Sequence, residues 1–187
     1  YSAEYGYNGV VLEECARRGK TDAATIAQVR GEAYTSFLRD AKNLIASRGK
    51  RMRVNLNVDW FRPEPPFIRR LAYSANIDYD WKRWVDEGLL DEGIVRIFQM
   101  PFNTIFDDAV VADMIASCQA KGIPLVVNRY INQNYPDEFM RVRNDGRFRG
   151  FILYETATFL KFQDPAGCVP QNDVVNRVFG MMKETAQ

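Results

Sequence analysis

Carboxylates stand at the ends of two apolar stretches, and they are the side chains of this sequence best suited to chemistry. Glu13 and Glu14 end the first stretch, and Glu155 ends the last one. Two carboxyl groups that face one cleft can cleave a glycosidic bond, because one protonates the leaving oxygen while the other attacks the sugar or activates water. We therefore expect Glu13 or Glu14 to work with Glu155 as a catalytic pair. The structural alternative is an ion pair with an arginine such as Arg17 or Arg18.

Aromatic, amide and guanidinium groups beside other apolar stretches suit the recognition of sugars. Asp59 precedes Trp60, and an aromatic ring can stack on a pyranose while a carboxylate accepts hydrogen bonds from its hydroxyls. Gln99 and Asn128 offer amides to further hydroxyls, and Arg129 could fix a carboxylate of the substrate or of a catalytic residue. The alternatives are local: Asp59 could cap a loop, the amides could bond backbone, and Arg129 could hold a structural ion pair.

The composition removes several kinds of catalysis. The 187 residues include no histidine, and the three cysteines form no CxxC pair, so serine–histidine catalysis and a histidine-ligated metal are excluded. Few lysines stand at the ends of apolar stretches, which argues against Schiff-base chemistry. Oxygen ligands from Glu13, Glu14 and Asp59 could hold Ca²⁺ or Mg²⁺, but no ligand-loop spacing supports this, and we predict neither metal nor cofactor.

The charge of the chain is balanced, with 25 basic and 24 acidic residues. Nucleic acid and anionic membranes are therefore not expected partners. Arginine-rich segments at 17–18 and 50–53 flank predicted helices, and solvated helix ends account for them. No apolar stretch approaches the roughly 20 residues needed to cross a bilayer, so we expect no membrane span.

Five short apolar stretches alternate with helical patterns, and this order positions the candidate residues. The expected strands are residues 9–14, 52–61, 93–100, 123–130 and 150–155. Alternating strands and helices predict a parallel α/β sheet, and (β/α)₈ barrels hold their active sites at the C-terminal ends of such strands. Long loops, which could wall a cleft at that edge, are expected at 15–30, 62–78, 130–149 and 156–171.

Helical patterns with recognisable ends separate the strands. Apolar residues recur with helical spacing over 34–45, and Gly49 follows as a residue that ends a helix at positive φ. Asp107 or Asp108 can cap a second helix, and a last helix begins near 172–173. The apolar helical residues expected in the core are Val111, Met114, Ile115 and Cys118, with Trp81 and Trp84 from a short helix at about 80–87.

Five parallel units cannot close a barrel by themselves. An open half-barrel would expose the inner face of its sheet, which a monomer tolerates poorly. We therefore interpret residues 1–187 as a single domain that forms the C-terminal part of a TIM-like (β/α)₈ barrel, strands four to eight. The first three strands would be missing, or supplied by an N-terminal half-barrel or by a second copy of the chain. A doubly wound sheet is the competing fold.

Three segments resemble the glycosyl-hydrolase-like barrels of bacterial secreted proteins. They read YGYNGVVLEE at 5–14, YTSFLRDAKNLIASRGKRMRVNLNV at 34–58 and DYDWKRWVDEGLLDEGIVRIFQMPF at 78–102. They are similar to the family's fourth strand, to the helix that leads through Gly-Lys into the fifth strand, and to the tryptophan-containing approach to the sixth. The resemblance spans about residues 5–130.

The resemblance implies hydrolysis of the glycosidic bonds of a poly- or oligosaccharide and a secreted or periplasmic location, with a cytoplasmic one as the alternative. Leu12-Glu13-Glu14 falls where the family carries Leu-Asp-Asp, so the charge is kept on a side chain longer by one methylene. Gln99 stands on strand six, where carbohydrate-active barrels often place a second carboxylate, and an amide cannot act as a general acid. Two functions therefore stay open: a hydrolase, and a non-catalytic saccharide-binding barrel.

Overall fold

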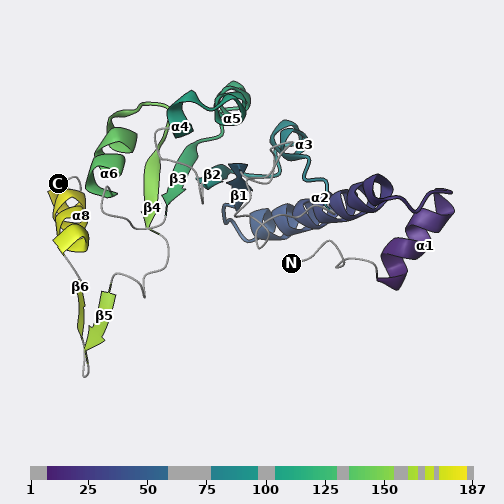
Figure 1. Ribbon diagram of the computed structural model, residues 1–187, viewed down its shortest axis with the longest axis horizontal. Coiled ribbons are helices and arrows are strands. Elements are labelled where there is room, and N and C mark those ends of the chain that lie inside the picture. The colour runs from purple at the N-terminus through teal and green to yellow at the C-terminus, as the bar shows by residue number, and fades with distance from the viewer. Residues whose placement is uncertain are drawn as a thin grey trace.

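The computed structural model describes residues 8–58, 77–96, 104–129, 135–153, 160–163, 167–170 and 173–184. Figure 1 shows a parallel sheet with helices between its strands, a helical hairpin on one side and a two-stranded ribbon that stands apart from the sheet on the other. The elements in chain order are α1 (Gly9–Arg17), α2 (Ala23–Ser47), β1 (Arg53–Asn57), α3 (Trp81–Asp86), β2 (Glu92–Arg96), α4 (Thr104–Asp107), α5 (Ala109–Ala120), β3 (Leu125–Arg129), α6 (Tyr135–Asn144), β4 (Gly150–Leu153), β5 (Leu160–Gln163), β6 (Gly167–Pro170) and α8 (Asp173–Glu184).

The sheet confirms the prediction of a parallel α/β fold. Its strands lie in the order β1-β2-β3-β4, and every neighbouring pair is parallel (Figure 1). Crossovers between parallel strands are almost always right-handed, so strands in sequential order receive their connecting helices on the same face. A doubly wound sheet reverses its strand order at a switch point, and these four strands show no reversal. Among the described residues the sheet is open, without barrel closure.

One face of the sheet is packed against the helices, and the other is partly polar. Side chains alternate between the faces of a strand, and register partners share a face. Val54, Val95 and Val127 lie on the helix side, inside the main core, with Trp84 and Met114 from the helices. The opposite face carries the alternate residues Arg53, Asn55, Glu92, Ile94, Arg96, Val126, Asn128, Gly150 and Ile152. Any site on the face away from the helices must be built from that second set.

A tight contact joins α2 to the segment before α3. The Trp84 indole donates a hydrogen bond to the Thr35 hydroxyl at 2.9 Å, and the Trp84 ring centroid lies 5.5 Å from that of Tyr34. A Cβ added to Gly31 would stand 1.9 Å from the carbonyl oxygen of Asp78. Glycine is therefore required at this position of α2, because any side chain would push the two segments apart.

The predicted helix ends and core residues are confirmed. Asp108 caps α5 through its carboxylate, which accepts hydrogen bonds from the backbone N–H of Val110 and Val111. Gly49 follows α2 with φ 64°, and α8 begins at Asp173. The residues expected in the core are buried: Trp81, Trp84, Val111, Met114, Ile115 and Cys118.

The first expected strand, residues 9–14, is wrong, because this segment lies in the helix α1. Asn8 caps that helix, since its side chain accepts a hydrogen bond from the Val11 N–H at 3.1 Å. A short apolar run fits either element, and here the helical alternative buries Cys15 while Val10 stays 77% exposed. The sheet therefore has four of the five expected strands.

Three of the expected loops contain regular structure. Helix α2 begins inside the segment 15–30, and α6 occupies the middle of 130–149. The segment 156–171 contains β5 and β6, which pair antiparallel. Most of the remaining expected loop, 62–78, lies outside the described residues. The loop at 15–30 was expected because it follows the expected first strand, but in the structure α2 begins there and packs Ile26 and Val29 against α1.

Candidate functional site

The C-terminal edge of the sheet holds one expected polar residue, Asn128, beside an arginine that was not expected. Asn128 of β3 is 8% exposed and pairs in register with Arg96 of β2 and with Ile152 of β4. These positions lie on the face opposite the helices, at the ends of neighbouring strands. Sequence reasoning predicted Asn128 but missed Arg96, although a single arginine inside the apolar run GIVRIF was a usable signal.

Three predicted binding residues and the predicted catalytic Glu155 lie outside the described part of the chain. Asp59, Trp60, Gln99 and Glu155 belong to the segments that follow β1, β2 and β4. In the sequence, Asp59 comes two positions after the end of β1 and Glu155 two positions after the end of β4. The backbone of Arg129 ends β3 as expected, in register with Leu153. Each of the four parallel strands thus leads toward at least one predicted residue.

Glu13 and Glu14 do not stand at a strand end, and the argument that placed them in an active site is therefore wrong. Both lie on α1, which packs against α2. Glu14 is ion-paired with Arg17, and the Arg18 guanidinium donates a hydrogen bond to it at 2.9 Å. This is the structural alternative that the sequence left open. Glu13 is exposed on the same helix.

A second glutamate completes the charge balance around α1. The Arg18 guanidinium also donates to Glu32 of α2, at 2.7 Å and 3.3 Å. The two carboxylates raise the pKa of Arg18, with Glu32 the larger cause, and Arg18 in turn lowers the pKa of Glu32. Each charge here already has a protein partner, so the cluster closes the helical hairpin and needs no ligand.

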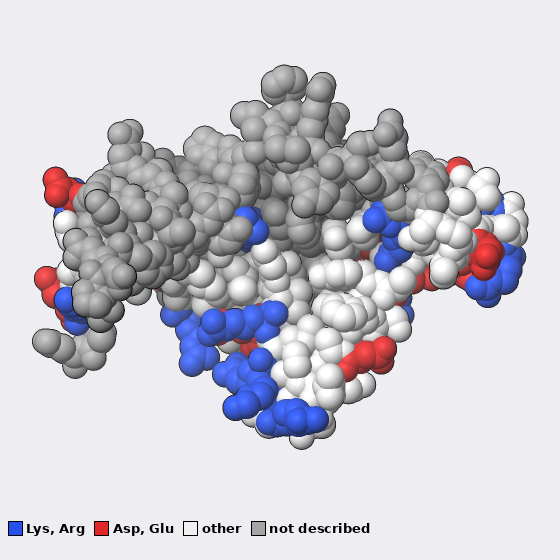
Figure 2. All heavy atoms as spheres, turned by 90° about the horizontal axis from the view of Figure 1, so that it is seen from below, with Lys and Arg blue, Asp and Glu red and all other residues white. Residues whose placement is uncertain are grey.

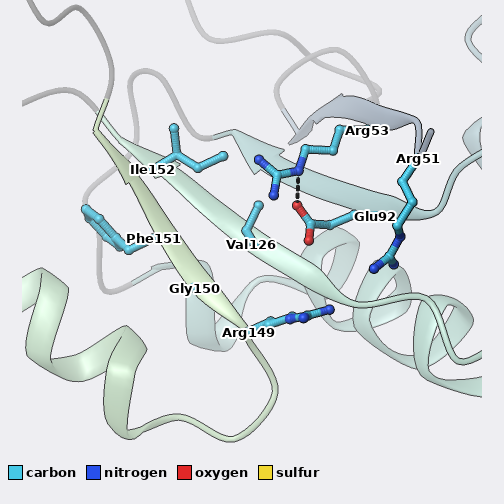
Figure 3. A pocket seen from close by; sticks show the side chains of 8 residues that line it. All are labelled: Arg51, Arg53, Glu92, Val126, Arg149, Gly150, Phe151 and Ile152. Carbon is cyan, nitrogen blue, oxygen red and sulfur yellow. Dashed lines mark ion pairs between the residues drawn. The ribbon is translucent and has the colours of Figure 1, made fainter. Parts of the chain in front are cut away.

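A pocket of about 320 Å³ opens at the other end of the sheet, where β1, β2 and β4 begin (Figure 3). Glu92 is the buried carboxylate at this pocket, and its Oε1 lies 2.5 Å from the Nε of Arg53. Arg51 donates a hydrogen bond to the backbone carbonyl of Asp91 at 3.0 Å. The residues that line the pocket are Arg51, Arg53, Glu92, Val126, Arg149, Gly150, Phe151 and Ile152.

Sequence reasoning missed this pocket because its arginines are far apart in the chain. The segment 50–53 was assigned to a solvated helix end, and Arg149 stands almost one hundred positions later. Only the register of β1 to β4 brings the two together. Figure 2 shows that basic side chains gather on one part of the surface, with most of the visible acidic ones elsewhere. A net charge near zero therefore conceals an uneven distribution.

Within the described ranges, no group of three or more His, Cys, Asp or Glu residues could hold a metal ion. The helices in those ranges include none that is both long and apolar enough to cross a membrane. Comparison with protein-family models, with curated proteins and with solved structures finds no match to this chain.

Proposed function

We propose that the chain is part of a carbohydrate-active hydrolase whose saccharide site lies at the C-terminal edge of the sheet. The observation that carries this proposal is the sequential parallel order β1-β2-β3-β4, because it points four strand ends toward one edge. Barrels assembled from such units keep their active sites at that edge. The remaining strands of a closed barrel would come from an N-terminal half-barrel or from a second copy of the chain.

The proposed site combines hydrogen-bonding groups with two carboxylates. Asn128 and Arg96 share the inner face near the strand ends, where an amide and a guanidinium can hold sugar hydroxyls or a uronate carboxylate. With Glu13 and Glu14 on α1, the carboxylates that come within two positions after a strand of the parallel sheet are Asp59 and Glu155. We assign the catalytic pair to these two, one as general acid and the other as nucleophile or base. A secreted or periplasmic location belongs to the same proposal.

The test is release of reducing ends from a panel of neutral glucans and uronate polymers. Asp59→Asn and Glu155→Gln should each lower turnover by about 10²-fold or more, since removal of a general acid or base has effects of this size. Glu13→Gln is the matched control, because it removes one charge from an exposed helix position. Unchanged turnover in both Asp59→Asn and Glu155→Gln would contradict the assignment.

A saccharide-binding protein without catalysis is the second candidate. It is favoured by one observation: the described side chains at this edge, Arg96 and Asn128, are a guanidinium and an amide, which bind sugars but do not transfer protons at neutral pH. Gln99, an amide as well, follows β2 in the sequence. Calorimetric binding of an oligosaccharide without release of reducing ends would identify this function, and Asn128→Ala should then weaken the binding.

A further inference from the structure

We propose that the pocket at the N-terminal end of the sheet binds the phosphate group of a phosphate monoester. Three guanidinium groups and one carboxylate line this hollow, and they come from the starts of β1, β2 and β4. The site lies at the opposite end of the sheet from the proposed saccharide site. It therefore does not depend on the proposed hydrolase activity.

Two of the three arginines form no ion pair within the described part of the chain. Arg53 is paired with Glu92, whose side chain is 8% exposed, so these two charges cancel. Arg51 bonds a backbone carbonyl, which positions the guanidinium without neutralising it. Among the residues that the structure describes, Arg149 forms no ion pair. The pocket therefore carries two net positive charges, which match a phosphate dianion.

The nearest additional carboxylate is already occupied. Asp91 lies directly before β2, where it could have neutralised Arg51. Its carboxylate instead pairs with Lys42 at 2.6 Å and accepts a hydrogen bond from the Met52 N–H at 2.7 Å. Lys42, the Met52 N–H and, more weakly, the charge of Arg51 hold the pKa of Asp91 below its ordinary value, so Asp91 stays an anion whose direct partner is Lys42. The positive charge of the pocket is thus built into the packing around it.

Backbone contacts fix the strand starts from which the basic side chains extend. The Arg149 N–H donates to the carbonyl of Leu125 at 2.7 Å, which fixes the start of β4 beside β3. In Figure 3 the guanidinium groups of Arg51 and Arg149 lie on the same side of Glu92, over the first residues of the strands. Guanidinium groups bind phosphate through paired N–H donors, and the hydrogen bond from Arg51 to the Asp91 carbonyl reduces the entropy that this side chain loses on binding.

The size of the hollow favours an ester over the bare ion. A volume of about 320 Å³ falls at the lower end of the range for small-molecule sites. Val126 and Ile152, which lie on the same sheet face as Arg53 and Glu92, add apolar side chains that can contact the organic part of the ester. Phenyl phosphate therefore serves as the ester probe, and inorganic phosphate as the probe of the anion alone.

The experiment measures binding of both probes to the whole chain by calorimetry and ³¹P nuclear magnetic resonance. Arg149→Gln and Arg51→Gln should each raise the Kd by about tenfold or more, as expected for loss of a charge-assisted hydrogen bond. Glu92→Gln should lower the Kd, because it removes the one negative charge of the pocket. Arg143→Gln is the matched control, since it makes the same charge change at an exposed site on α6 and should leave the Kd unchanged.

The charge of the ligand gives an independent readout. The second ionisation of a phosphate monoester has a pKa near 6, so binding of the ester should strengthen between about pH 5 and pH 8 if the pocket selects the dianion. Binding that does not change with pH would overturn the monoester assignment. Absence of saturable binding, or equal weakening by Arg143→Gln and Arg149→Gln, would overturn the site itself. Circular dichroism of each variant verifies that the fold is kept.

Discussion

The α1–α2 hairpin and the parallel sheet are held together in different ways. Three buried residues, Cys15, Ile26 and Val29, form the core of the hairpin, and Val11 packs against them. Within the described ranges, the cluster around the sheet contains 20 buried residues, which come from helices α2 to α6, from the first three strands and from the segments that connect them. Buried apolar area is the main source of folding free energy, so the sheet carries most of the stability.

The two regions also differ in how they treat charge. In the hairpin, Arg18 lies between Glu14 and Glu32, and the cluster is neutral when the neighbouring Arg17 is counted with it. At the N-terminal end of the sheet, three arginines meet one glutamate. A neutral cluster on the surface serves to close helices against each other. An unbalanced one leaves positive charge available to an anion from solution, which is the basis of the phosphate proposal.

The largest effect is expected from the core of the sheet. Trp84→Ala should lower the free energy of unfolding by about 3–5 kcal/mol, since it leaves a large cavity and removes the partner of the Thr35 hydroxyl. Urea unfolding followed by circular dichroism measures the change. Phe37→Ala is the control, because Phe37 is an aromatic residue of α2 that is 62% exposed. Similar losses in both variants would contradict the assignment of Trp84 to the main core.

Thiol labelling can compare the two regions within one molecule. Cys15 is buried in the hairpin, and Cys118 is buried in the core of the sheet. Burial raises the pKa of the Cys118 thiol to about 11. Labelling of a buried thiol requires local opening, and the hairpin has the smaller core to break. We expect Cys15 to be modified at least about tenfold faster than Cys118, a difference of about 1.4 kcal/mol in opening free energy.

Peptide mapping by mass spectrometry assigns each modified cysteine. In denaturant the two thiols should react at similar rates. That result would show that the difference in native labelling rates arises from structure and not from local sequence. Faster labelling of Cys118 under native conditions would reverse the ranking of the two regions.

The smallest effect is expected from the carboxylates of α1. Glu14→Gln should lower the Tm by about 2 °C or less, because ion pairs at the surface contribute little. Glu13→Gln removes the same charge from the neighbouring exposed position, where the described residues provide no ion pair, and should change the Tm even less. Differential scanning calorimetry measures both. A loss of hydrolytic turnover in Glu14→Gln with an unchanged Tm would return this residue to the candidate active site.

Local sequence signals predicted much of the sheet and little of the site. The strands β1 to β4 are short apolar runs between helix caps such as Asp108 and glycines such as Gly49, so their physical causes lie within a few residues. The first run failed because a period of two and a period of 3.6 fit GVVLEE equally well. Packing against Ile26, which no local pattern reveals, selects the helix.

The pocket could not be found in the sequence for a related reason. Arg51 and Arg149 approach each other only through three successive strand pairings, and the offset of each pairing depends on the packing of the whole sheet. Asn128 was found because its own strand is enough to place it at an edge. The position of a single residue at the end of a strand can thus be predicted from the sequence. The residues that lie beside it on other strands cannot.

The sequential strand order has a consequence for how the chain folds during synthesis. Each strand pairs with the one made just before it, and the paired residues Arg53 and Glu92, Gly93 and Leu125, and Val126 and Gly150 are 39, 32 and 24 positions apart (92 − 53, 125 − 93, 150 − 126). The strand with which a new strand pairs has therefore already left the ribosome when the new strand emerges. Each βα unit can add its strand to the sheet as soon as it is synthesised, before the C-terminal part of the chain has been made.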